Sequence, residues 1–211
     1  MGQLIQWFRD LRDYLRQVWR ANWLTLSQAE AIGWMLFFLF FLWYAIGKEG
    51  GDFLFLDSGN AVVHEGGHAL FGHFGDFLGV AGGTILQLLV PLLLALAFHV
   101  RRQAVGYALF LLIVFENLLY VSKYMGDARA RALTYIAIGG GAFSGDEMPD
   151  PSMHDWYNLF SRFGVLQYDT RIAAAVFKFA WAGMIGTVLW FGWRCYRSWR
   201  DGWKRQAALD M

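Results

Sequence analysis

Two histidines and a glutamate lie together in a glycine-rich part of the chain, in the order His64-Glu65-Gly66-Gly67-His68. On an α-helix both imidazoles project from one face, because the histidines are four residues apart, and they can hold a single Zn²⁺. Glu65 would then lie beside the metal, where a carboxylate can take a proton from a metal-activated water. The spacing therefore predicts a zinc site for hydrolysis, with His64 and His68 as ligands and Glu65 as the catalytic acid and base.

The surrounding segment, residues 60–78, has the length of a helix but contains four glycines and three histidines. Such a segment cannot be an ordinary lipid-facing span, since polar groups are costly in the bilayer unless they are buried in protein or functional. The alternative to a zinc site is a pair of buried, hydrogen-bonded histidines without a metal. The apolar setting favours the metal site.

The composition indicates a membrane protein, because 57% of the 211 residues are hydrophobic, 18% are aromatic and only 17% are charged. Apolar runs at residues 32–46, 84–100, 104–124 and 172–193 are predicted to be membrane-spanning helices. The predicted fold is an all-α polytopic membrane protein with about 4 to 6 membrane segments, one of them the glycine-rich helix.

The N-terminal region is predicted to be an amphipathic helix on the membrane surface, because apolar and basic side chains recur at helical spacing over residues 4–19. A helix packed on a partner domain is the alternative. We expect residues 1–28 to form this interfacial helix, residues 29–200 a single transmembrane domain with the metal site, and residues 201–211 a short polar tail.

The distribution of basic residues predicts the topology. If residues 60–78 re-enter the bilayer without crossing it, both termini and the Arg101-Arg102 turn lie on one side, which the positive-inside rule makes cytoplasmic. A full crossing would require residues 133–143 to cross as well, so re-entry is favoured. The opposite side then holds the four candidate site residues His64, His68, Asp127 and His154.

Three blocks between about residues 60 and 130 resemble the site-2-protease-like intramembrane zinc metalloproteases. Residues 63–70 are similar to the family's H-E-x-G-H-A helix, and residues 82–91 to the glycine-rich stretch that opens the following span, with the proline displaced. Asn117, followed by Asp127, resembles a degraded form of the family's N-x-x-P-x-x-x-x-D-G block. The resemblance implies intramembrane proteolysis of a transmembrane peptide, with Asp127 as the third zinc ligand. The alternative role for Asp127 is an N-cap of a helix through residues 130–133.

A second group of polar residues follows an acidic loop. Ser152 and Asp155 form an S-x-x-D capping box for a helix that ends near Gly164, which explains Asp155 without a metal. His154 is then unassigned. It is the alternative third ligand or a donor to the oxyanion formed during hydrolysis, and its plainer role is that of a surface residue.

The polar pair Glu116 and Asn117 lies inside the apolar run 104–124, where it either lines a substrate path or bonds to another helix. Cys195 is the only cysteine, so one chain can form neither a disulfide framework nor a thiolate cluster. The net charge of +1 gives no reason to expect nucleic acid as a partner.

The sequence thus predicts a membrane-embedded zinc-dependent hydrolase, with an intramembrane metallopeptidase as the first choice. The alternatives are a zinc hydrolase of a lipid or small amphiphile, and a non-catalytic assembly or sensing protein whose zinc is structural. A peptidase needs a strand with which an extended substrate can pair, and residues 52–56 are the only short β-like candidate. The expected partners are membrane lipids, a transmembrane peptide substrate and a second copy of the chain.

Overall fold

The computed structural model describes residues 2–47, 55–133, 135–137, 141–143 and 153–209, and most of these residues are helical. The helices are α1 (Gly2–Arg20), α2 (Gln28–Gly47), α3 (Phe55–Phe71), α4 (Asp76–Val100), α5 (Ala104–Gly126), α6 (Asp155–Arg162) and α7 (Asp169–Leu209). Two 3₁₀ turns, η1 (Gly72–Phe74) and η4 (Leu166–Tyr168), precede α4 and α7. The strands β1 (Tyr135–Ala137) and β2 (Gly141–Phe143) pair antiparallel as a small hairpin.

Within the described part of the chain, four helices are long and apolar enough to cross a membrane, spanning Gln28–Ile46, Asp76–Val100, Ala104–Gly126 and Leu166–Asp201. Each contains one of the four predicted apolar runs, which confirms the all-α polytopic fold. The helices extend beyond those runs: α4 begins at Asp76, and α7 continues to Leu209 through most of the predicted tail.

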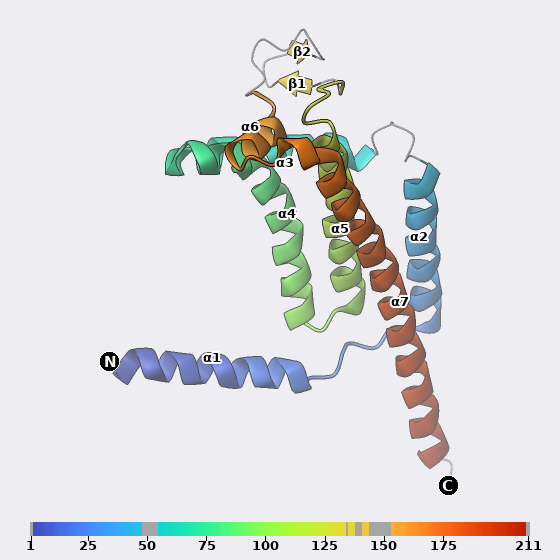
Figure 1. Ribbon diagram of the computed structural model, residues 1–211. Helices are drawn as coiled ribbons and strands as arrows, with labels where there is room; N and C mark the ends of the chain where they lie inside the picture. Colours follow the sequence, from blue (N-terminus) through green and yellow to red (C-terminus); the bar gives the residue numbers. More distant parts are fainter. Residues whose placement is uncertain (1, 48–54, 134, 138–140, 144–152, 210–211) are drawn as a thin grey trace.

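The spanning helices form one bundle, in which α4, α5 and α7 lie side by side and α2 packs against α7 (Figure 1). Its core contains the buried side chains of Phe38, Leu112, Met184 and Phe191. Many large apolar side chains on the outer faces of α2, α4 and α7 are exposed, as lipid contact requires.

Helix α1 lies across one end of this bundle, near the turn between α4 and α5 (Figure 1). Arg102 in that turn is buried; its guanidinium donates to the carbonyl of Val18 and lies 5.1 Å from the ring centroid of Trp23. The backbone N–H of Leu24 donates to the Arg102 carbonyl at 2.9 Å. These contacts hold the N-terminal helix at the end of the bundle towards which the C-terminal part of α7 also points.

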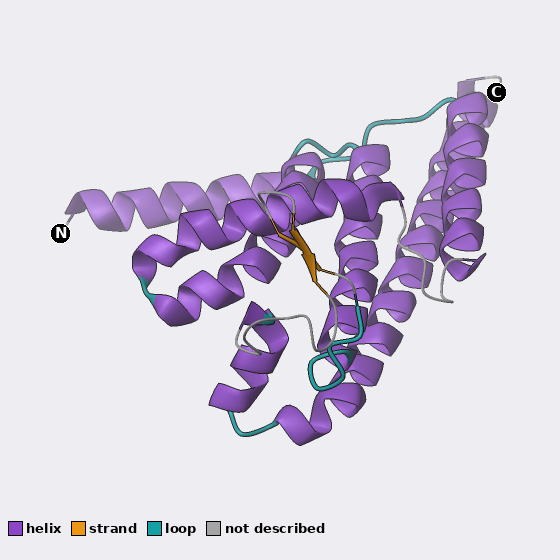
Figure 2. Ribbon diagram, turned by 90° about the horizontal axis from the view of Figure 1, so that it is seen from above, coloured by secondary structure: helices purple, strands orange, loops and turns teal. Residues whose placement is uncertain are grey.

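The glycine-rich helix α3 lies across the end of the bundle opposite α1 (Figures 1 and 2). Its 17 residues do not form one of the four candidate spans. Helix α6 and the β1–β2 hairpin lie at the same end (Figure 1). Residues 135–137 and 141–143, which a full crossing of α3 would require as part of another span, are strands.

Candidate metal centre

Glycines bring α3 into backbone contact with α4. A Cβ on Gly67 would overlap the carbonyl of Gly82, and a Cβ on Gly82 would lie 2.5 Å from the carbonyl oxygen of Gly67. No larger residue fits either position without separating the helices. The same contact places His64 against α4, because a Cβ on Gly83 would lie 2.5 Å from Nε2 of His64.

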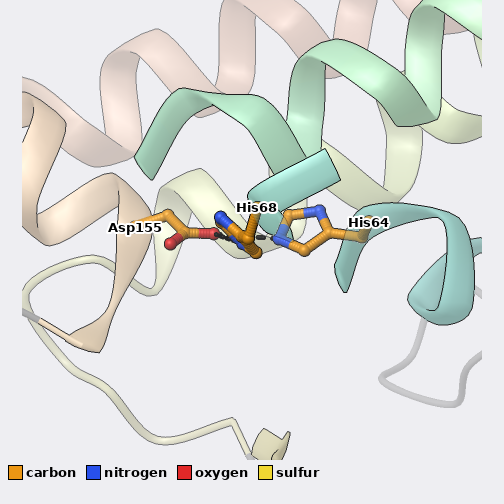
Figure 3. A group of neighbouring side chains, drawn as sticks. All are labelled: His64, His68 and Asp155. Carbon is orange, nitrogen blue, oxygen red and sulfur yellow. Dashed lines mark hydrogen bonds and ion pairs between the residues drawn. The ribbon is translucent and has the colours of Figure 1, made fainter. Parts of the chain in front are cut away.

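Both predicted histidine ligands face one carboxylate, that of Asp155 at the start of α6 (Figure 3). Oδ2 of Asp155 lies 2.9 Å from Nε2 of His64 and 3.2 Å from Nε2 of His68. His64 and Asp155 are buried, and the side chain of His68 is 26% exposed. One potential ligand atom from each residue lies within 4.8 Å of the other two.

This arrangement fits a zinc ion. Two ligand atoms on a tetrahedral zinc at about 2.0–2.1 Å are separated by roughly 3.3 Å, close to the 3.2 Å between His68 and Asp155. Two imidazoles and one carboxylate also make a donor set that is common in catalytic zinc sites. The three ligand atoms all lie within 4.8 Å of one another, so these residues could hold a metal ion.

Hydrogen bonds to the far side of each ring turn Nε2 towards this centre. Nδ1 of His68 lies 2.7 Å from the carbonyl oxygen of Gly79, and Nδ1 of His64 lies 3.2 Å from Oε1 of Gln87. Because a carbonyl oxygen only accepts, each Nδ1 carries the hydrogen. Metal-binding histidines commonly donate their second ring N–H in this way.

The negative charge of Asp155 favours a proton on His68, one of the groups that would bind the metal. The hydrogen bond with Asp155 outweighs burial and, with the charges of Asp155 and Glu65 and the bond to Gly79, raises the pKa of His68 to about 9. Burial raises the pKa of Asp155, but the hydrogen bonds from His64 and His68 outweigh it and lower that pKa overall. The metal-free site is therefore an ion pair, and half-buried Glu65 lies close enough for its charge to act on it.

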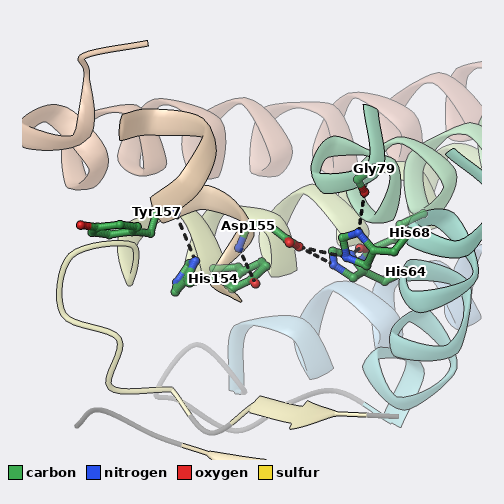
Figure 4. A network of polar contacts seen from close by, with 8 residues as sticks. His64, His68, Gly79, His154, Asp155 and Tyr157 are labelled. Carbon is green, nitrogen blue, oxygen red and sulfur yellow. Dashed lines mark hydrogen bonds and ion pairs between the residues drawn. The ribbon is translucent and has the colours of Figure 1, made fainter. Parts of the chain in front are cut away.

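The start of α6 differs from the predicted capping box. Ser152 lies outside the described residues, and the N-cap is His154, whose Nδ1 accepts the backbone N–H of Tyr157 at 3.3 Å (Figure 4). Asp155 is the first residue of the helix, and its own N–H donates to Oη of Tyr124 at 3.2 Å. Among the described residues the N-cap is therefore His154 and not the predicted Ser152, and the carboxylate of Asp155 bonds to the histidines of α3.

Asp127 closes the end of α5. Its two carboxylate oxygens accept the backbone N–H groups of Ala132 at 2.8 Å and Leu133 at 3.1 Å. Residues 127–130 form a turn, so the alternative prediction of a helix N-cap is wrong. Nε2 of His154 lies 3.8 Å from Oδ2 of Asp127, and the His154 ring stacks on Tyr124. Among the described residues, neither Asp127 nor His154 belongs to the cluster around the histidines of α3.

The polar pair in α5 is buried between helices. Glu116 and Asn117 are each 1% exposed. Oε2 of Glu116 lies 3.4 Å from Nδ2 of Asn60, and Nδ2 of Asn117 donates to the carbonyl of Gln87 at 2.9 Å. These bonds join α5 to α3 and α4, as in the helix-bonding alternative.

Two residues of the site were not assigned from sequence. Asp155 is brought to the histidines by tertiary folding, and its only local signal was an acidic residue beside a histidine, between a polar loop and an aromatic segment. Gln87 was a polar exception in an apolar run, four residues before Pro91. The β-like candidate is not a described strand, since residues 52–54 lie outside the described part and Phe55 begins α3.

Comparisons of the chain with protein-family models, with curated proteins and with solved structures find no match. The resemblance to intramembrane zinc metalloproteases therefore rests on the three sequence blocks, and the arrangement of His64, His68 and Asp155 stands on its own geometry.

Proposed function

We propose that this protein is a membrane-embedded zinc-dependent hydrolase with His64, His68 and Asp155 as metal ligands and Glu65 as general acid and base. The observation that carries the proposal is the convergence of three ligand atoms within 4.8 Å, from helices far apart in sequence. In this assignment Asp155 takes the ligand role that the sequence resemblance gave to Asp127.

The part of the chain that the structure describes offers three candidate ligands, a number that suits catalysis. Structural zinc sites use four protein ligands, whereas catalytic sites use three and leave a position for water or substrate. When bound, zinc would supply a water of lowered pKa and polarise the bond to be cleaved. Glu65 follows His64 on α3, is half-buried, and acts electrostatically on His68. Its carboxylate would take the proton from the attacking water and pass it to the leaving group.

A peptide is the favoured substrate, and the β1–β2 hairpin supports this choice. The hairpin lies at the same end of the bundle as α3 and α6 (Figure 1). An extended peptide can add to the edge of a small antiparallel sheet, where main-chain hydrogen bonds hold it. The site would receive the end of a transmembrane segment on the side opposite α1, and the basic end of the bundle with both termini would be cytoplasmic.

The test compares purified wild-type protein with Glu65→Gln in detergent, with Asp10→Asn on exposed α1 as the control. Zinc content is measured by mass spectrometry. Hydrolysis of transmembrane peptides and of phospholipids is followed in ¹⁸O-labelled water, because a hydrolytic product gains the label. We expect all three proteins to hold zinc and Glu65→Gln to lose hydrolysis by about 10²–10⁴-fold.

The products identify the substrate class. Labelled peptide products support the metallopeptidase, and labelled lipid products support the amphiphile hydrolase. X-ray absorption that shows four protein ligands and no exchangeable water would instead establish a structural zinc, and wild-type protein that holds no zinc would overturn the proposal.

A further inference from the structure

Pro91 lies inside α4 and removes a hydrogen-bond donor from the helix. In an α-helix the carbonyl of residue 87 accepts from the N–H of residue 91, and proline has none. A carbonyl freed inside an apolar bundle must find another donor. Asn117 of α5 supplies it, since its Nδ2 donates to the Gln87 carbonyl at 2.9 Å and both side chains are 1% exposed.

This single bond determines the orientation of two side-chain amides. Because the Gln87 carbonyl can only accept, the Asn117 amide must present nitrogen to it, which leaves Oδ1 for its other contact. Oδ1 of Asn117 accepts from Nε2 of Gln87 at 3.4 Å. The orientation of the Gln87 amide is then fixed as well, with its oxygen Oε1 3.2 Å from Nδ1 of His64.

This series of hydrogen bonds ends at His64, one of the proposed metal ligands. Nδ1 of His64 faces an acceptor and therefore carries a hydrogen, while Nε2 on the other side of the ring faces Asp155. His68 does not need a side-chain amide held in one orientation, because its Nδ1 faces the main-chain carbonyl of Gly79, which cannot turn round. The Gln87 amide could turn and offer nitrogen, and the bonds through Asn117 prevent this.

We propose that Gln87 and Asn117, fixed by the carbonyl that Pro91 leaves free, are positioning residues that present Nε2 of His64 to the metal. The inference rests on the proposed zinc site, and it assigns a role to polar groups inside the membrane bundle. Removing the support of a histidine ligand typically weakens metal binding by 10–100-fold.

The test uses three variants. Gln87→Leu removes the acceptor of the His64 N–H, and Asn117→Leu removes the amide that fixes the orientation of Gln87. Gln87→Glu keeps an acceptor for the His64 N–H. Thr84→Val is the matched control, because Thr84 lies one turn before Gln87 on α4 and its hydroxyl has no hydrogen-bond partner among the described residues. Zinc affinity of the full chain is measured by competition with a chelator. Histidine ¹⁵N NMR of the zinc-loaded protein reports which ring nitrogen of His64 carries the hydrogen.

We expect the two leucine variants to bind zinc 10–100-fold more weakly and to lose the single Nδ1–H form of His64. Thr84→Val should match the wild type, and Gln87→Glu should bind zinc more tightly than Gln87→Leu. Leucine variants with unchanged affinity and an unchanged His64 signal would overturn the positioning role while leaving the zinc site intact. Wild-type protein that binds no zinc would overturn the proposed function and, with it, this inference.

Discussion

The carboxylate of Asp155 lies 2.9 Å from Nε2 of His64, although 91 residues separate the two in the chain. The same oxygen lies 3.2 Å from Nε2 of His68, so one atom of α6 faces both histidines of α3. The proposed metal centre depends on this contact between α3 and α6.

Replacing the two candidate acidic ligands separately distinguishes their roles. Asp155→Ala removes one of three ligands, and we expect zinc affinity to fall by at least 100-fold. Asp127→Ala should keep zinc but lower the free energy of unfolding by about 1–3 kcal/mol, because two backbone N–H groups lose their acceptor. Metal analysis and thermal unfolding measure both effects. Zinc loss in Asp127→Ala alone would return the ligand role to Asp127.

The two glycines inside the histidine motif should respond in opposite ways to alanine. A Cβ on Gly67 would overlap the Gly82 carbonyl, whereas a Cβ on Gly66 meets, among the described residues, only Cδ2 of Leu86 at 3.8 Å, an ordinary contact. We expect Gly67→Ala to separate α3 from α4 and abolish zinc binding. Gly66→Ala should be tolerated, with a gain of up to about 1 kcal/mol from helix propensity. Equal zinc affinity in both variants would contradict the close contact.

Zinc affinity should rise with pH. The metal-free site holds a proton on His68, whose pKa is raised to about 9, and zinc must displace that proton. Below about pH 9 the binding constant should increase roughly tenfold per pH unit from this group alone. Calorimetry in buffers of different ionisation enthalpy measures the protons released. An affinity that is constant from pH 7 to 8.5 would show that His68 binds zinc without releasing a proton.

The stability of the metal-free protein should follow the opposite trend. The folded pKa of His68, about 9, lies above its ordinary value of 6.5. The ion pair with Asp155 therefore stabilises the fold fully below about pH 6.5, and this contribution is lost as the pH rises through about 9. Thermal unfolding with a chelator present should show this decline, and His68→Gln should remove it.

Pro91→Ala should separate bundle stability from metal binding. Alanine restores an N–H that can bond to the Gln87 carbonyl, which competes with Asn117 for that acceptor. We expect the bundle to melt at a higher temperature, while zinc binds more weakly than in the wild type. A variant that is more stable and binds zinc equally well would show that the carbonyl does not need to be free.

Local spacing was sufficient to predict that His64 and His68 lie on one face of α3, because residues four apart on a helix share a face whatever the rest of the fold does. The four spans were predictable for a similar reason, since a bilayer selects apolar runs of helical length. Asp155 was not predictable in this way. Its position depends on how α6 packs, and the local pattern with Ser152 offered a competing explanation that needs no tertiary contact.

The hydrogen bonds between Gln87 and Asn117 could not be predicted from the sequence for another reason. Gln87 and Asn117 come from different helices, and the sequence does not give the rotation of α4 against α5. The spacing between Gln87 and Pro91 does carry information, because a proline inside a span always frees the carbonyl four residues earlier. A polar residue elsewhere in the chain must then supply the donor, and Asn117 was the amide of the polar pair inside the next run.

The position of Asp155 on α6 also affects the chain as a polymer. A metal shared by His64 and Asp155 would close a loop of 91 residues that includes α4, α5 and the hairpin. Cross-linking a loop of that length lowers the conformational entropy of the unfolded chain by an amount worth roughly 4 kcal/mol. The ion would thus act as a cross-link between α3 and α6, the helix that precedes α7.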